Sequence, residues 1–267
     1  MKLTTKKTLW IFAMAIVLSV LGLVVNSRIK LSSDVIIGGA DGAFVESTGL
    51  KDALYGYDEV GEIVIRAPEG LDYPNLDIEN WRYLLANKDN TINKYEPEKL
   101  KESRQKGIMF DDNALSAIDN LLEAAEEAGF TPYVTCSYVS YEEQKEIFTD
   151  KAKEIAENGG YSMDEAKEIA AKLVAYPGTS EHQTGLCIDI ADKEYEEIPD
   201  YAAMDKQFFR WLDANCAEYG FIKRYPPELK SLTGWDEPWH YRYVGKEAAQ
   251  FIMENDLCLE EFIDHYR

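Results

Sequence analysis

The chain has 267 residues, and 28 Lys and Arg stand against 49 Asp and Glu, which gives a formal net charge of −21. Binding to nucleic acid phosphates needs clustered basic side chains, so this charge balance rules against nucleic acid as a partner. The four cysteines include no Cys-x-x-Cys pair, so we expect free, buried thiols, although a disulfide is permitted outside the cytoplasm.

The first 28 residues have the pattern of an export signal. Lys2, Lys6 and Lys7 precede an uncharged apolar run over residues 9–25, and polar residues follow. A run of this length is at the short end of what spans a bilayer, and the basic flank should stay cytoplasmic. A cleaved signal peptide is the alternative, but small residues are missing at the expected cleavage positions. We therefore predict an uncleaved transmembrane anchor, with the rest of the chain extracytoplasmic.

The remaining chain divides into two parts. Residues 29–75 contain short β-like runs at 35–37 and 62–66, broken by Gly and Pro, and are predicted to be a juxtamembrane spacer. Apolar residues then become denser and periodic, so residues 76–267 are predicted to form one folded domain.

The first strong helical pattern covers residues 114–125, where apolar side chains recur at helical spacing. Asp111 or Asp112 is the predicted N-cap, and Gly129 is placed to end the helix. A strand should follow over residues 131–137.

Two capping boxes predict the next helices. Ser140 with Glu143 should open a helix that continues toward Gly159, and Ser162 with Glu165 repeats the signature.

The C-terminal third alternates between strands and one helix. The helix is predicted over 205–219, and Gly220 ends it. The predicted strands are 186–191, 221–225 and 239–244. His265 lies in an acidic C-terminal tail and should be solvated. Helices segregate from strands, so the predicted class is α+β, with a small antiparallel sheet flanked by helices.

Two of the only three histidines lie in short motifs with a carboxylate. His182 and Asp189 are separated by a stretch that contains Gly185, where the backbone can turn sharply. Glu237 precedes His240 by three residues. Zinc hydrolases usually hold the metal through three His, Asp or Glu ligands and leave one position for water. We predict His182, Asp189 and His240 as Zn2+ ligands and Glu237 as the general base. A single histidine on an apolar strand is more often a core residue than a ligand, so the prediction depends on both motifs jointly.

The pattern Ser-x-His-x-x-Gly-x-x-x-Asp over 180–189, followed by Glu-Pro-Trp-His-x-Arg over 237–242, resembles the VanY-type D-alanyl-D-alanine carboxypeptidases. These belong with the lysostaphin-like and hedgehog-type zinc folds, and the similarity covers about residues 80–267. The resemblance implies the same ligands and catalytic glutamate. It also implies that Ser180, Gln144 and Trp239 line the substrate pocket.

One position departs from the family pattern Ser-x-Tyr-Arg-Ser-Tyr, because Val139 stands where the family has arginine. The arginine is implied to hold the substrate carboxylate or the developing oxyanion, and losing such a bond can lower the rate by about 10² to 10³. Arg242 or Arg224 could substitute, and Tyr138 and Arg242 complete the predicted substrate-binding set. Cys187, where the family tends to have alanine, is expected to be a small core residue.

The resemblance implies a zinc carboxypeptidase that removes a terminal residue, expected to be D-alanine, from peptidoglycan stem peptides. Together with the N-terminal segment, this predicts an enzyme anchored in the cell membrane. An endopeptidase is the alternative within the same reaction class. A catalytically weakened module that binds cell-wall peptide is a further alternative, which Val139 keeps open. We expect a monomer.

Overall fold

The computed structural model describes residues 56–57, 63–194 and 204–267. The predicted transmembrane anchor and the β-like run at 35–37 lie outside these residues. Within the described ranges, no helix combines the length and apolar character needed to cross a membrane. The β-like run at 62–66 does form a strand, β2 (Ile63–Val64), which pairs antiparallel with β1 (Gly56–Tyr57).

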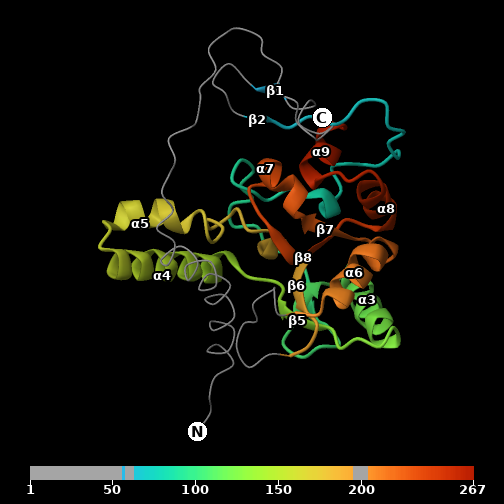
Figure 1. Ribbon diagram of the computed structural model, residues 1–267, viewed down its shortest axis with the longest axis horizontal. Helices are drawn as coiled ribbons and strands as arrows, with labels where there is room; N and C mark the ends of the chain where they lie inside the picture. Colours follow the sequence, from blue (N-terminus) through green and yellow to red (C-terminus); the bar gives the residue numbers. More distant parts are fainter. Residues whose placement is uncertain (1–55, 58–62, 195–203) are drawn as a thin grey trace.

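A four-stranded antiparallel sheet with the order β5-β6-β8-β7 forms the centre of the molecule (Figure 1). Its strands are β5 (Tyr133–Cys136), β6 (Cys187–Ala191), β7 (Phe221–Tyr225) and β8 (Glu237–Tyr243). A separate antiparallel pair consists of β3 (Leu100–Glu102) and β4 (Met109–Asp111). The predicted α+β class is confirmed. Because β8 begins two residues earlier than predicted, Glu237 belongs to the strand.

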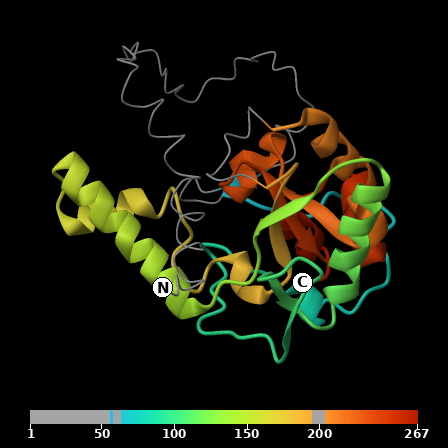
Figure 2. The same ribbon diagram turned by 90° about the horizontal axis from the view of Figure 1, so that it is seen from below.

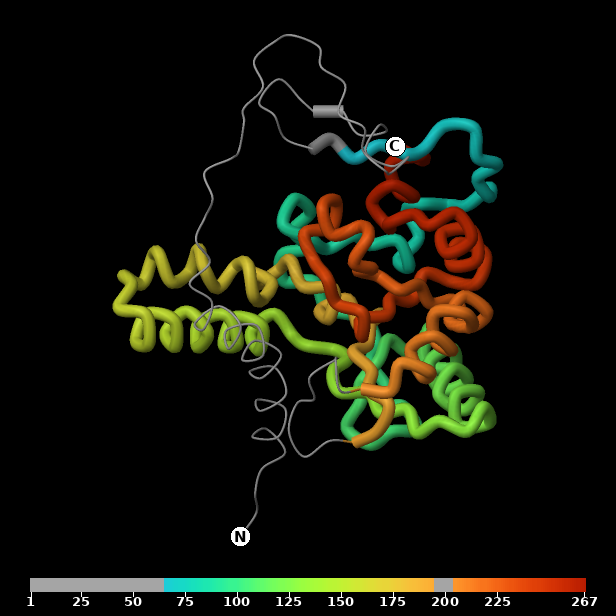
Figure 3. Tube along the Cα trace, in the orientation of Figure 1, coloured from blue at the N-terminus to red at the C-terminus, as the bar shows by residue number. Residues whose placement is uncertain are grey.

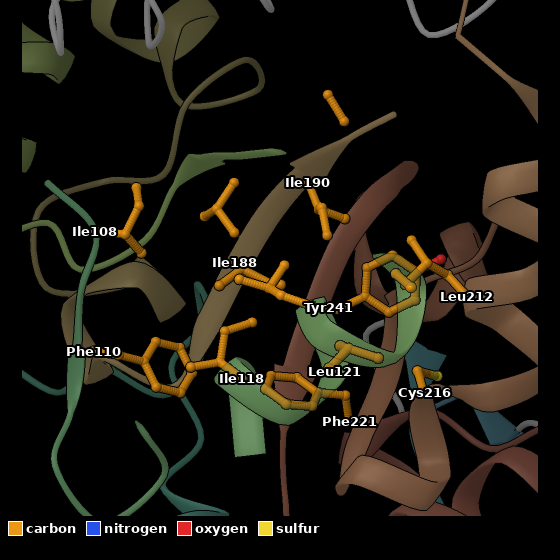
Figure 4. Packing of buried hydrophobic residues seen from close by; sticks show 14 of the residues in the cluster. Ile108, Phe110, Ile118, Leu121, Ile188, Ile190, Leu212, Cys216, Phe221 and Tyr241 are labelled. Atoms are coloured by element: carbon orange, nitrogen blue, oxygen red, sulfur yellow. The ribbon is translucent and has the colours of Figure 1, made fainter. Parts of the chain in front are cut away.

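Two helices cover one face of this sheet. They are α3 (Leu115–Glu127) and α6 (Lys206–Asn215), which a 3-10 turn, η4 (Cys216–Tyr219), extends. Figure 4 shows how Ile188 and Ile190 of β6 and Tyr241 of β8 pack with Ile118 of α3 and Leu212 of α6. Successive side chains of a strand point to opposite faces, so the residues between these core positions lie on the other face. That face carries the predicted site.

The predicted N-cap of α3 is wrong. The N-cap residue is Ala114, which makes no side-chain cap bond. Asp111 instead accepts hydrogen bonds from the backbone and side-chain nitrogens of Asn113, at 2.8 and 2.9 Å. Aspartate therefore stabilises the turn before the helix, a local alternative to capping that short polar side chains offer.

The two helices predicted from capping boxes form a hairpin that projects from the rest of the molecule (Figures 1, 2 and 3). They are α4 (Tyr141–Gly159) and α5 (Met163–Ala170). Both boxes are present as reciprocal bonds, Ser140 with Glu143 and Ser162 with Glu165. Both predictions are confirmed. They could be made from the sequence because each box joins residues only three apart.

The C-terminal segment is packed and is not a free tail, although His265 itself is exposed, as expected. It forms α8 (Lys246–Glu254) and α9 (Leu259–Asp264), which enclose a second apolar cluster with Tyr83 and Ile222. His265 is exposed, yet its ring stacks on Tyr73 with 3.7 Å between ring centroids. The remaining short elements are η1 (Trp81–Tyr83), η2 (Glu181–Thr184), η5 (Pro227–Leu229) and α7 (Lys230–Thr233).

The end of the predicted spacer packs on these C-terminal helices. The backbone N–H of Ala67 donates to Asp264 at 2.9 Å, and the Tyr266 hydroxyl donates to the carbonyl oxygen of Pro74 at 2.5 Å. Leu71 and Tyr73 also pack against the second apolar cluster. Residues just before the predicted domain boundary therefore contribute to the same packed unit.

Candidate functional site

Two neighbouring strands and one 3-10 turn bring the predicted zinc ligands together. Asp189 of β6 and His240 of β8 are direct partners in the strand register, so their side chains leave the same face of the sheet side by side. His182 lies in η2, a few residues before β6 begins.

Gly185 makes this approach possible. It ends η2 in the left-handed conformation, with φ 68°. A Cβ atom there would lie 3.2 Å from the side chains of Leu100 and Pro97 and 3.3 Å from the backbone nitrogen of Asp111. Glycine is therefore required both by the backbone angle and by the close packing. The predicted sharp turn at this residue is confirmed.

The three predicted ligands meet at the Asp189 carboxylate. Its Oδ1 lies 2.9 Å from Nδ1 of His240, and its Oδ2 lies 3.4 Å from Nε2 of His182. The two imidazole rings are nearly perpendicular, with centroids 5.0 Å apart. Ligand atoms around a tetrahedral zinc ion, with bonds of about 2.0–2.1 Å, are about 3.3 Å apart. The contacts of Asp189 are close to this spacing, and the donor set is of the type that zinc prefers, so the residues fit the ion.

A backbone carbonyl orients His182. Its Nδ1 lies 2.7 Å from the carbonyl oxygen of Ser137. Because a carbonyl oxygen only accepts hydrogen bonds, Nδ1 must carry a proton, which leaves Nε2 as the nitrogen that can bind a metal. This arrangement is typical of metal-binding histidines.

Glu237 stands at the start of β8, next to the ligands. Its Oε2 lies 3.8 Å from Nδ1 of His240, and its side chain is 24% exposed. Burial raises the pKa of Glu237 to about 7; the His240 charge opposes this rise and the Asp189 charge adds to it. A carboxyl group that titrates near neutral pH can both accept and donate a proton.

The buried ligands themselves have shifted pKa values in the metal-free protein. Burial by itself would raise the pKa of Asp189, but His182 and His240 outweigh it and hold the pKa well below its usual range. Burial by itself would lower the pKa of His182, but Cys136, Cys187 and Asp189 raise it well above its ordinary value. The site therefore pairs an ionised carboxylate with histidines that hold their protons strongly.

Two cysteines lie closer to the site than the sequence indicated. The donor atoms of His182, Cys187 and His240 lie within 4.8 Å of one another, and so do those of Cys136, His182 and Asp189. All four cysteines are free, as predicted. Cys187 is buried, as expected, but it faces both histidines. The available signal was its position two residues before Asp189, which places both side chains on one face of a strand.

The other predicted substrate residues have varied surroundings. Gln144 is buried, and its amide donates to the carbonyl oxygen of Ala175 at 2.7 Å. Ser180 is buried at the N-cap of η2, and Tyr138 is partly buried. Trp239 packs against the core cluster on the face opposite His240, so the structure does not bring it to the ligands.

The prediction that Arg242 contacts substrate is wrong. Arg242 is 0% exposed and donates to Glu181 at 3.1 Å and to the carbonyl oxygens of Arg82, Leu84 and Tyr243 at 2.9–3.1 Å. Arg224 is also buried and donates to Glu181 and to a second glutamate. Neither guanidinium group can replace the arginine that is missing at position 139.

Comparison with known proteins agrees with this geometry. The family model described as VanY, D-alanyl-D-alanine carboxypeptidase, matches residues 107–246, which is more than half of the chain. A D-alanyl-D-alanine carboxypeptidase of Enterococcus faecalis is 40% identical over 191 residues, which cover 70% of this chain and 68% of that protein.

Solved structures with the same fold include two of particular interest. A variant of the vancomycin-resistance D,D-pentapeptidase VanY in complex with Zn(II) has a TM-score of 0.59 and 39% identity, covering 69% of this chain and 99% of that one. The LD-carboxypeptidase LdcB has a TM-score of 0.59 and 33% identity, covering 72% and 93%. The chain therefore belongs to the VanY family of D-alanyl-D-alanine carboxypeptidases and is a zinc carboxypeptidase.

Proposed function

We propose that this protein removes the terminal D-alanine from peptidoglycan stem peptides through a zinc site made of His182, Asp189 and His240. The observation that carries the proposal is the contact of one carboxylate, that of Asp189, with both imidazoles. The D-alanyl-D-alanine activity named for the Enterococcus faecalis relative supports the choice of substrate.

The two histidines would hold the ion through different nitrogens. His182 would use Nε2, because its Nδ1–H donates to the carbonyl oxygen of Ser137. His240 would use Nδ1, which faces Asp189. Zinc bound there supplies a Lewis acid that lowers the pKa of water and polarises the scissile carbonyl.

Glu237 serves as the general base and then as the general acid. It takes one proton from the attacking water molecule, whose oxygen forms the new bond to the carbonyl carbon. It then gives this proton to the nitrogen of the leaving D-alanine as the C–N bond breaks. Its position 3.8 Å from His240 Nδ1 supports both roles, since it places the carboxylate beside a residue that would hold the metal.

The direct test is to incubate the zinc-loaded protein with a stem pentapeptide that ends in D-alanyl-D-alanine and to follow the products by mass spectrometry. We expect loss of a single D-alanine. Glu237→Gln should lower turnover by about 10² or more and retain zinc, because it removes the base and no ligand. Loss of zinc in this variant would contradict the assigned roles.

Parallel substrates test the finer alternatives. A tetrapeptide that ends in one D-alanine after an L-centre measures L,D cleavage, the activity named for the structural relative LdcB. A cross-linked stem peptide measures cleavage within the peptide. Release of internal fragments without free D-alanine would identify an endopeptidase.

A peptide-binding module with weakened catalysis is the second candidate, and Val139 is the observation that favours it. Val139 is buried, and its N–H donates to the carbonyl oxygen of His182 at 3.2 Å. If this position faces the substrate carboxylate, Val139→Arg should raise turnover by about 10². An unchanged rate in a folded, zinc-loaded variant would remove the argument for weakened catalysis.

We also propose that residues 1–28 anchor the chain in the cell membrane as a single pass and that the catalytic domain acts outside as a monomer. The basic flank and the apolar run over 9–25 support this topology. In cells, the full chain should fractionate with membranes, and protease added outside should digest the domain. A shortened form released into the medium would indicate a cleaved signal peptide instead.

A further inference from the structure

A buried network of four charged side chains lies behind His240. Glu181 accepts hydrogen bonds on Oε1 from Arg224 Nε at 2.9 Å and from Arg242 Nη1 at 3.1 Å. Arg224 also makes two parallel bonds to Glu260 of α9, at 2.6 and 2.9 Å. The two carboxylates and the two guanidinium groups balance in charge. Each is more than nine-tenths buried, so the network excludes water.

Two atoms at the edge of this network have no hydrogen-bond partner among the described residues. They are Oε2 of Glu181 and Nε2 of His240, and they face each other at 3.4 Å. Both side chains are buried, His240 at 2% exposure and Glu181 at 3%. Leaving a buried polar atom unpaired is unfavourable, and a small shift would bring these two within bonding distance.

We propose that Glu181 is a positioning residue for the metal ligand His240: its carboxylate accepts a hydrogen bond from Nε2–H and thereby directs the Nδ1 lone pair at the zinc ion. The inference rests on the proposed function, which assigns His240 to zinc. In the metal-free structure Nδ1 of His240 also faces a carboxylate, with Oδ1 of Asp189 at 2.9 Å, so both ring nitrogens donate there. When Nδ1 binds zinc, the imidazole keeps one proton, and Glu181, which can only accept, holds that proton on Nε2. The thiol of Cys187 also lies beside the ring, but it is a weaker acceptor than a carboxylate.

Arg224 and Arg242 hold the Glu181 carboxylate in the orientation that faces His240. With Oε1 held by two guanidinium donors, Oε2 is the atom left to face His240. The second ligand histidine is oriented differently, because His182 donates to the neutral carbonyl of Ser137. Through Arg224 and Glu260, the network connects the zinc site to the C-terminal helix α9.

Glu181→Gln tests the inference with almost no change of shape. If the Gln oxygen faces the arginines, its NH2 group faces Nε2 and favours the tautomer whose Nδ1 carries the proton and cannot bind metal. If the amide turns over, its NH2 group opposes two guanidinium donors. We therefore expect zinc affinity, measured by competition with a chromogenic chelator, to fall by about 10-fold to 100-fold.

Glu260→Gln is the matched control. It removes one negative charge from the same buried network, at a carboxylate that also binds Arg224, but Glu260 has no contact with His240. We expect it to lower the melting temperature and to leave zinc affinity unchanged. Equal losses of affinity in both variants would mean that the network acts through general stability, which would overturn the positioning role.

Nitrogen-15 NMR of histidine in the zinc-loaded wild-type protein gives an independent test that needs no variant. We expect the His240 proton on Nε2, protected from exchange. A proton on Nδ1 would overturn the inference even if Glu181→Gln does not fold. Failure of the wild-type protein to bind zinc would instead refute the proposed function. Retained affinity in Glu181→Gln alongside normal hydrolysis would refute only the role of Glu181.

Discussion

At the scale of single residues, three carboxyl groups of the site differ because their neighbours differ. Asp189 lies between two histidines, and Glu181 lies between two arginines. Burial alone would raise the pKa of each carboxyl group. In both cases the neighbouring cations outweigh burial and hold the pKa well below its usual range. Burial also raises the pKa of Glu237, but the neighbours of this residue include both anions and cations. One carboxyl therefore suits proton transfer, one suits metal binding and one suits a fixed charge.

The pKa of Glu237 predicts a pH-dependent cost to the stability of the metal-free protein. Its pKa rises from 4.5 in the unfolded chain to about 7 in the folded protein. Burying this group therefore does not lower the folding stability below pH 4.5, where it is protonated in both states. Stability is lost as the pH rises from there through 7. We expect metal-free Glu237→Gln to be more stable than wild type at pH 8 by about 2 kcal/mol and nearly equal at pH 4. Urea unfolding in the presence of chelator measures both values. A pH-independent difference would indicate repacking rather than ionisation.

At the scale of elements, the turn from η2 into β6 decides the geometry of the site. Gly185 lies between His182 and Asp189, and the β3–β4 pair closes over it, with Leu100 and Asp111 in contact. The short connection holds the two ligands within reach of one ion. A backbone shift here would move both of them.

Gly185→Ala should therefore affect stability and zinc binding together. A left-handed alanine costs about 1 kcal/mol, and the contacts at 3.2–3.3 Å add to this, so we expect about 2 kcal/mol of destabilisation and weaker zinc binding. Gly129→Ala is the control, since Gly129 has φ 91° but a Cβ added there would meet no atom within 4 Å. The control should lose stability and keep zinc affinity. Equal zinc affinity in all three proteins would contradict the importance of this turn.

At the scale of the whole molecule, the zinc site joins segments that are distant in the sequence. Arg242 of β8 donates to the carbonyl oxygens of Arg82 and Leu84, and Glu260 of α9 accepts from Asn87. The segment before the first long helix, the central sheet and the last helix therefore all meet behind the metal ligands. Zinc binding should stabilise this assembly as a unit, since the ligands are brought together only in the folded chain.

Zinc binding should also release protons. The pKa values of His182 and His240 lie well above 6.5 in the metal-free protein, and both imidazoles must lose a proton to bind the ion. We expect release of about two protons per zinc ion near pH 7, and weaker binding as the pH falls. Titration calorimetry in buffers with different ionisation enthalpies measures the number. A binding heat that is independent of the buffer would contradict it.

The sequence alone determined the features that depend on short separations. The capping boxes at Ser140 and Ser162 specify helix starts through bonds three residues long, and Gly185 marks the turn beside the ligands. The two histidine motifs were sufficient to select His182, Asp189, His240 and Glu237 as neighbours, because each motif pairs a histidine with a carboxylate, the residue types that bind zinc.

Only the tertiary structure decided the features that depend on strand register and on distant partners. It paired Asp189 with His240, buried Arg242 behind the site instead of exposing it to substrate, and turned an acidic tail into a packed helix with Glu260 in an ion network. A charged residue has the same appearance in the sequence whether it faces solvent or a buried partner. The physical reason is that burial and charge pairing are set by contacts between segments far apart in the chain, which local patterns do not encode.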